Sequence, residues 1–366
     1  MNRSLADRIV NAVLYEGYIL YPYRPSVKNR QRWTFGGLYP AAYYRQTRGS
    51  ESAENRTECI VRGNADTTIE VTVRFLHLTQ RQVGEFLTPL KVWPEKDEDV
   101  PAFERVESLR CGNREFHTWQ EAEEREVAVQ KLNLGVLRDC SHRCVFVFDD
   151  RRWREPIAAE DGKYDGILLR EQQSLAGEVD ASVVALTEEL FRLTVVVRNL
   201  TLLETPASRD DALMRTLVSA HTLLGVNGGE FISLVDPPTD YRDAANTCRS
   251  VGVWPALVGD PARADTMLAS PIILYDYPRV APESPGDLFD ATEIDEILSL
   301  RILTLTDDEK RQAIAVDERA RALLERTESL GAEELLGLHG TIRERSAQES
   351  SPHAERENRA RGHDGL

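Results

Sequence analysis

A period of two in the apolar residues constrains the fold of this chain most. Residues 69–75 (IEVTVRF) and 191–197 (FRLTVVV) alternate between apolar and polar side chains, the pattern of a strand with one buried face. Apolar runs at 145–148, 167–169 and 180–186 indicate further strands, the first of them fully buried. No helical pattern of usable length lies between these runs. The spacing therefore predicts an antiparallel β-sandwich or barrel and argues against a parallel sheet with crossover helices.

Helical signals flank this β-rich region on both sides. Residues 4–14 (SLADRIVNAVL) form a short amphipathic pattern that Ser4 can cap. After residue 205, Ser208 and Asp211 make a capping box. An apolar stripe at helical spacing follows the box at Leu213, Leu217, Ala220 and Leu224. Further capping pairs predict helices within residues 292–345.

These patterns together predict an α+β protein with an antiparallel β-sandwich-like N-terminal portion and a helical C-terminal portion. The β-rich, sandwich-like domain with its N-terminal helix spans residues 1–204, and a mainly helical portion at 205–345 packs on it. Residues 346–366 are polar and show no apolar periodicity, so we expect a disordered tail. We find no internal repeat.

The chain has a net charge of -16, yet one segment reverses this sign. Residues 15–44, called here the basic-aromatic stretch, are rich in Tyr and Arg, and no acidic residue occurs between Glu16 and Glu51. Arginine donates a fork of hydrogen bonds to carboxylates, and Tyr and Trp are preferred anchors of protein interfaces. The candidate partner-binding residues are Tyr21, Tyr23, Arg24, Lys28, Arg30, Arg32 and Trp33. The alternative is that the aromatic side chains enter the core, the arginines are solvated or ion-paired, and nothing binds.

Composition narrows the classes of function. A pI near 5.0 argues against general nucleic-acid binding, which depends on neutralising phosphates with Lys and Arg. No apolar run has the length of a membrane helix, so we expect no membrane insertion. The N-terminus lacks the pattern of a signal peptide, and the 5 cysteines are scattered, which favours a cytoplasmic location.

Few residues suggest a catalytic or metal-binding role. Cys140, His142 and Cys144 are close enough in sequence to contribute to a metal site, but no second cysteine pair completes a zinc motif. Cys144 can equally serve as a small apolar residue of the neighbouring strand. His221 is interpreted as a polar-edge or core histidine beside the helical stripe, and the acidic cluster at 287–296 as a solvated helix start. We assign no catalytic residue, no metal site and no cofactor.

Three long blocks of the sequence resemble an uncharacterised bacterial family whose genes accompany those of nickel-iron uptake hydrogenases. The blocks are VLYEGYILYPYRPSVKNRQRWTFGGLYP (13–40), LVSAHTLLGVNGGEFISLVDPP (217–238) and ASPIILYDYPRVAPESPGDLFDATEIDEILSLRILTLTDDEKR (269–311). The resemblance covers about a quarter of the chain. It implies a context of hydrogenase biogenesis or support, and it supplies no catalytic residues.

The sequence thus favours a non-catalytic accessory protein of a nickel-iron hydrogenase. It would bind a protein partner, a hydrogenase subunit or maturation factor, through the basic-aromatic stretch. Two alternatives belong to other classes of protein. One is an enzyme, such as a hydrolase, that holds an anionic substrate at the same basic residues. The other is a metal-binding protein that uses Cys140, His142 and Cys144.

Overall fold

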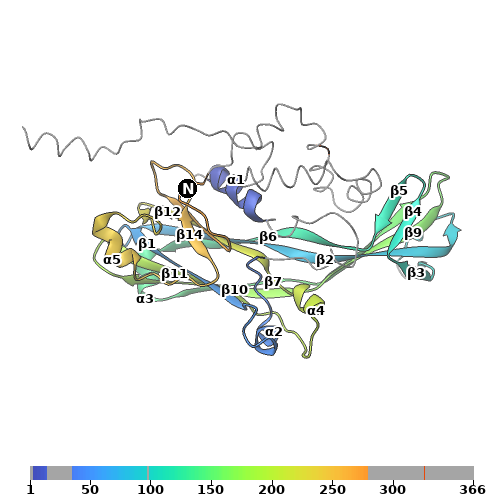
Figure 1. Cartoon of the computed structure of the whole chain (residues 1–366), viewed down its shortest axis with the longest axis horizontal. Helices are drawn as coiled ribbons and strands as arrows, with labels where there is room; N and C mark the ends of the chain where they lie inside the picture. Colours follow the sequence, from blue (N-terminus) through green and yellow to red (C-terminus); the bar gives the residue numbers. More distant parts are fainter. Residues whose placement is uncertain (1–2, 15–34, 97–98, 279–324, 326–366) are drawn as a thin grey trace, which may run out of the picture.

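The protein folds around two antiparallel sheets that face each other across one main core (Figure 1). The computed structural model describes residues 3–14, 35–96, 99–278 and 325. The five-stranded sheet has the order β13 (Glu230–Ile232), β1 (Glu54–Arg62), β11 (Leu190–Asn199), β10 (Leu175–Ala185) and β7 (His142–Phe148). The eight-stranded sheet has the path β14 (Trp254–Leu257), β15 (Thr266–Ser270), β12 (Val218–Asn227), β2 (Thr68–Leu90), β9 (Tyr164–Gln172) and β8 (Arg151–Ala158). The β-rich antiparallel character predicted from the sequence is confirmed.

Smaller elements decorate these sheets. Strands β6 (Trp119–Asn133) and β3 (Phe103–Val106) also pair with β2, and β4 (Ser108–Cys111) forms a hairpin with β5 (Arg114–His117). The helices are α1 (Arg3–Leu14), α2 (Ala41–Gln46), α3 (Leu134–Asp139), α4 (Arg209–Leu213), the 3-10 turn η2 (Thr239–Tyr241) and α5 (Arg242–Ala245). α1 lies where the sequence predicts a helix.

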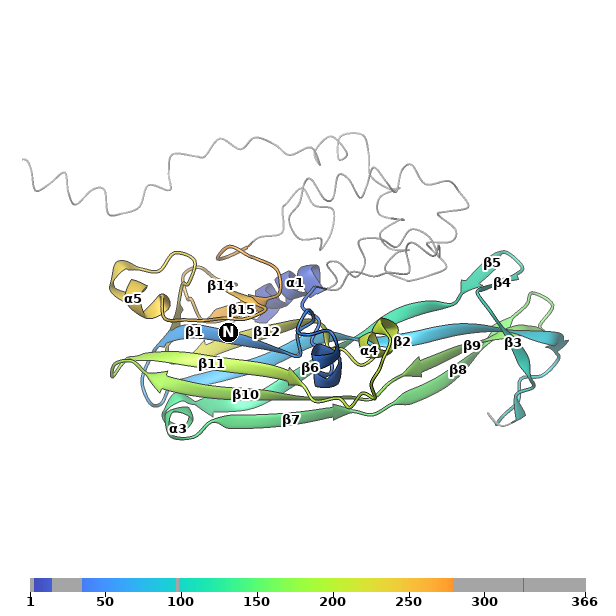
Figure 2. The same cartoon turned by 60° about the horizontal axis from the view of Figure 1, so that its bottom comes forward.

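Strand β2 runs almost the whole length of the eight-stranded sheet (Figure 2). Its N-terminal half lies between β12 and β6, and its C-terminal half lies between β9 and β3. The apolar residues of the first half, including Val71, Val73 and Phe75, pack into the main core. Burying each such side chain contributes roughly 1.5–3 kcal/mol. The alternation seen in the sequence therefore fixes which face of β2 points inward.

A long two-stranded ribbon joins the two sheets. β7 and β8 on one side pair with β10 and β9 on the other in one continuous register, with Phe148 opposite Leu175 and Arg151 opposite Gln172. One end of the ribbon belongs to the five-stranded sheet and the other end to the eight-stranded sheet. Beyond this crossing the eight-stranded sheet continues as a projecting arm, made of the C-terminal half of β2 with β3, β8 and β9 (Figure 2).

Helix α1 covers the outer face of the eight-stranded sheet. Its apolar stripe, with Ile9 and Val10, packs against Leu223 of β12 and Leu268 of β15. Arg74 of β2 donates a hydrogen bond of 2.8 Å to Asn11 of the helix. β12 is therefore covered on both faces, by the main core on one side and by α1 on the other.

Two sequence predictions are wrong. The stripe Leu213–Leu224 is not a helix: α4 ends at Leu213, and β12 begins at Val218 as a central strand. The helical C-terminal portion is thus not supported, since residues 218–270 contribute strands to both sheets, and the helices predicted after residue 278 lie outside the described residues. Residues 145–148 do form a strand, but only Phe146 and Phe148 face the main core, and Val145 and Val147 are 57% and 62% exposed on the outer face of the sheet.

Candidate functional site

The seven residues proposed for partner binding lie outside the described part of the chain. These are Tyr21, Tyr23, Arg24, Lys28, Arg30, Arg32 and Trp33. The structure does describe the end of the basic-aromatic stretch and the residues just after it, 35–48. That segment shows how the stretch is anchored to the fold and which of its side chains reach the surface.

Two tyrosines anchor the end of the stretch. Tyr39 and Tyr43 are buried and stacked, with ring centroids 5.4 Å apart. They belong to an apolar cluster with Leu76 and Leu78, on the face of β2 opposite the main core. Leu38 also forms a β-bridge with Leu217, so the backbone is fixed beside β12. For these two tyrosines the alternative interpretation, burial in a core, is the observed one.

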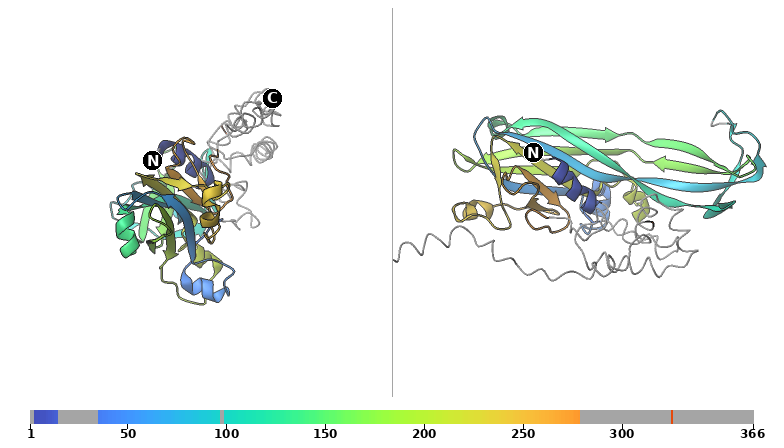
Figure 3. Two further views of the ribbon diagram at one scale, coloured as in Figure 1. Left: turned by 90° about the vertical axis from the view of Figure 1, so that its left-hand side faces the viewer. Right: turned by 90° about the horizontal axis from the view of Figure 1, so that it is seen from above.

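The remaining side chains of this segment face solvent. Phe35 is 39% exposed and Tyr44 is 43% exposed, while Arg45 and Arg48 are also exposed. No ion pair joins either arginine to a carboxylate of the described residues. α2, which carries Tyr44 and Arg45, projects away from the sheets (Figures 1 and 3). An aromatic ring and two guanidinium groups are thus held out from a rigid base.

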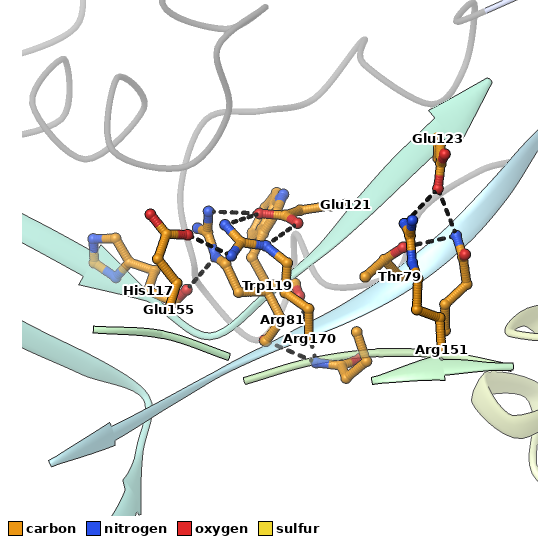
Figure 4. Close-up of polar contacts among 11 residues, drawn as sticks. Thr79, Arg81, His117, Trp119, Glu121, Glu123, Arg151, Glu155 and Arg170 are labelled. Atoms are coloured by element: carbon orange, nitrogen blue, oxygen red, sulfur yellow. Dashed lines mark hydrogen bonds and ion pairs between the residues drawn. The ribbon is translucent and has the colours of Figure 1, made fainter. Parts of the chain in front are cut away.

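A second polar site lies where the arm leaves the sandwich. Its first part is centred on Glu121 of β6, which lies between two arginines (Figure 4). Arg81 Nη1 donates to Glu121 Oε1 at 2.9 Å, and Arg170 Nε donates to Oε2 at 2.7 Å. Arg170 Nη1 also donates to Glu155 Oε2 at 2.7 Å. Three strands and the neighbouring β8 are therefore tied together by charge-assisted hydrogen bonds.

The second part of this site is centred on Glu123, two residues along β6. Arg151 Nη2 and Gln172 Nε2 donate to Glu123 Oε2 at 3.0 and 3.2 Å. Arg125 Nη2 donates to the amide oxygen of Gln172 at 3.0 Å, and its guanidinium lies 4.8 Å from the centroid of the Phe148 ring. We call both parts together the polar ladder: Arg81, Glu121, Glu123, Arg125, Arg151, Glu155, Arg170 and Gln172.

The polar ladder continues the inner face of the sandwich. His77 and Arg81 lie on the same side of β2 as Val73, because side chains alternate along a strand. Past Phe148 the ribbon crosses to the other sheet, so the apolar layer that covers Val73 does not extend over the ladder. Charged pairs replace apolar packing at this point.

Two ionisable groups in and beside the polar ladder, Arg170 and His77, each keep one protonation state at neutral pH. Burial alone would lower the pKa of Arg170, but its hydrogen bonds to Glu121 and Glu155 outweigh this and raise the pKa, so the guanidinium stays charged. Burial lowers the pKa of His77 to about 4, with Arg125 adding to the effect, so its ring is neutral at neutral pH. Because the carboxylates here are engaged by arginines, the ladder is suited to holding the arm in place.

His221 is a buried histidine, as the sequence suggested, but it lies on a strand. Its Nδ1 is 2.8 Å from the carbonyl oxygen of Ser219, and burial lowers its pKa to about 4. Ser219 has a φ of 55°, at an irregularity in the pairing of β12 with β2. Among the described residues Nε2 of His221 has no hydrogen-bond partner. The ring is therefore neutral and packs on the face of the sheet that α1 covers.

The three residues of the candidate metal cluster, Cys140, His142 and Cys144, lie in different environments. Cys140 caps the end of α3 and is exposed, while His142 and Cys144 lie on the inner side of β7. Cys144 packs against the main core. In the described part of the chain, no set of three or more His, Cys, Asp and Glu side chains gathers closely enough to hold a metal ion.

Comparisons of this chain with protein families, curated proteins and solved structures find no match. Within residues 3–14, 35–96 and 99–278, no helix has the length and apolar character that crossing a membrane requires.

Sequence reasoning did not find the polar ladder. Its signal is a period of two that continues past the apolar residues: His77, Thr79 and Arg81 follow Phe75 at every second position. The charged run at 120–126 follows the same rule in β6. The side-chain contacts of Glu121 and Glu123 with β9, 49 residues away, carry no local sequence signal.

Proposed function

We propose that this protein is a non-catalytic accessory protein that binds a protein partner through the basic-aromatic stretch. The partner would be a subunit or maturation factor of a nickel-iron hydrogenase. The observation that carries the binding role is the segment 35–48, where buried Tyr39 and Tyr43 hold exposed Tyr44, Arg45 and Arg48 away from the sheets. An anchored segment of this kind loses little conformational entropy when a partner binds.

Charge favours an acidic protein as the partner. The chain carries 61 acidic and 45 basic residues, so most of its surface repels an acidic protein. The basic-aromatic stretch offers such a protein guanidinium groups, and Arg and Tyr are the side chains most enriched at the centres of interfaces. The contact would therefore be local, centred on residues 18–48, and weakened by salt.

The hydrogenase context rests on the sequence resemblance alone. The alternative of an enzyme that holds an anionic substrate uses the same basic residues, so substitution of these residues disturbs both functions. The two proposals differ in what is bound: the accessory protein retains a macromolecule, whereas the enzyme turns over a small anion.

The proposal can be tested in the native host with one variant of the stretch. Arg24, Arg30 and Arg32 are changed to Glu, and Tyr23 and Trp33 to Ala. A control variant carries the same change of charge on exposed basic residues elsewhere, with Arg138, Arg152 and Lys163 changed to Glu.

We expect the stretch variant to fold and to reduce hydrogenase activity in cell extracts, with the control variant close to wild type. Full hydrogenase activity in cells that carry a normally folded stretch variant would refute the proposed function.

A further inference from the structure

The edge strand β7 is a surface that the proposed function does not use. It is the last strand of the five-stranded sheet, and among the described residues it pairs only with β10 (Figure 2). Its inner side is fixed, because Phe146 and Phe148 pack on Phe75. Its outer side carries Val145 and Val147, both more than half exposed. A preformed strand edge with unpaired backbone groups is a template for another strand.

We propose that two copies of this chain pair edge to edge through β7, antiparallel and about a twofold axis at Phe146. In this arrangement Val145 of each copy lies opposite Val147 of the other. Arg143 of each copy lies opposite Asp149, the first residue after the strand. Because the interface is symmetric, each of these contacts occurs twice.

The sequence of β7 selects this register over its neighbours. Side chains of paired strands must share a face, so the register can change only in steps that keep outer residues opposite outer residues. A shift in one direction places Arg143 opposite Val147. A shift in the other direction places Arg143 opposite Arg151 and Val145 opposite Asp149. Only the register centred on Phe146 matches charge with opposite charge and valine with valine.

The groups needed for the charged contacts are present at the surface. Arg143 is 60% exposed and is paired with Glu178, which Arg198 also holds at 2.8 Å. Arg143 can therefore turn toward a second carboxylate while Glu178 remains paired. Asp149 is exposed at the end of the strand.

The size of the contact sets its strength. Two seven-residue strands meet along one edge. The area that they bury is smaller than the roughly 1,200–2,000 Å² that stable interfaces usually bury. We therefore expect a reversible dimer with a dissociation constant in the micromolar range.

Sedimentation velocity of the full chain over a range of concentrations tests the proposal. Wild-type protein should shift from monomer to dimer as its concentration rises. Asp149→Arg, which changes an exposed side chain, and Arg143→Asp should each weaken the dimer at least about tenfold, equal to about 1.4 kcal/mol. The double variant Arg143→Asp/Asp149→Arg should recover most of the affinity, because it restores opposite charges in the same register.

Val184→Lys serves as a control, since Val184 is exposed on the same sheet but lies on β10, beyond the residues that pair with β7. It should leave the dimer unchanged. Wild-type protein that stays monomeric up to about 100 µM, with slow amide exchange along β7, would show that another part of the chain covers this edge and would overturn the proposal. A dimer that both single variants leave intact would overturn it as well. Neither result bears on the hydrogenase role, which has its own test.

Discussion

Two of the buried histidines, His77 and His221, should make the stability of this protein depend steeply on pH between neutral and mildly acidic conditions. His77 lies on the inner face of β2 beside Phe148, and His221 lies on the outer face of the same sheet under α1. Burial lowers the pKa of each ring from 6.5 to about 4. Each ring is therefore neutral in the folded protein at pH values where the unfolded chain already carries a proton.

The sign and the size of the effect follow from these values. Between pH 6.5 and about 4 the unfolded state binds more protons than the folded state, so stability falls as the pH falls through this window. For one histidine the loss between about pH 7 and about pH 4.5 amounts to about 2 kcal/mol, and the two together give about 4–5 kcal/mol. The two contributions should add, because the rings lie on opposite faces of the sheet.

Urea unfolding followed by circular dichroism at several pH values measures this loss. His77→Gln and His221→Gln cannot titrate, so each variant should lose about 2 kcal/mol less than wild type over the same pH interval. If both buried-site variants kept the full wild-type dependence, the reasoning about burial of neutral rings would be wrong.

Two further predictions concern packing and the polar ladder. Glu121→Ala takes the shared carboxylate from Arg81 and Arg170, whose side chains are 9% and 15% exposed, and should cost about 3–5 kcal/mol of unfolding free energy in urea titrations. Glu155→Ala, at 58% exposure, should cost less than about 1 kcal/mol in the same assay, and an equal cost would contradict the account of the ladder. Gly84→Ala places a methyl group 2.3 Å from the ring of Phe103, and a fall in melting temperature matching about 1–3 kcal/mol is expected; an unchanged temperature would show that the ring moves aside freely.

The strands that could be predicted from the sequence are those with one buried face. Residues 69–75 of β2 have the main core on one side, and the period of two records this directly. The same rule extends β2 beyond Phe75, but there the inner residues are polar and pair with β6 and β9. Beyond Phe75 the apolar positions are Leu76 and Leu78, which face away from the main core, so the pattern does not mark the polar inner residues as buried and the ladder was not apparent in the sequence.

β12 shows why a central strand can be mistaken for a helix. It is covered on both faces, so nearly all of its residues are apolar or small and no alternation appears. In such a run, residues spaced by three and four are also apolar, which imitates a helical stripe. The capping box at Ser208 is real, since Ser208 Oγ accepts a hydrogen bond of 3.0 Å from the Asp211 backbone, but it starts a helix of only five residues.

The edge position of β7 also has no local signal. Residues 145–148 are all apolar, as in a buried strand, and only the order of strands in the sheet shows that one side is open. The anchoring of the basic-aromatic stretch is similar, because nothing local distinguishes buried Tyr43 from exposed Tyr44. Both distinctions come from tertiary packing.

The central claim, a protein partner held by the basic-aromatic stretch, is tested most directly by quantitative affinity purification from the native host during hydrogenase expression. Tagged wild-type protein is compared with the variant in which Arg24, Arg30 and Arg32 become Glu and Tyr23 and Trp33 become Ala. We expect hydrogenase subunits or maturation factors to be recovered with the wild type and lost with the variant. Wild-type protein that brings down none of them, or recovery that the variant leaves unchanged, would contradict the claim.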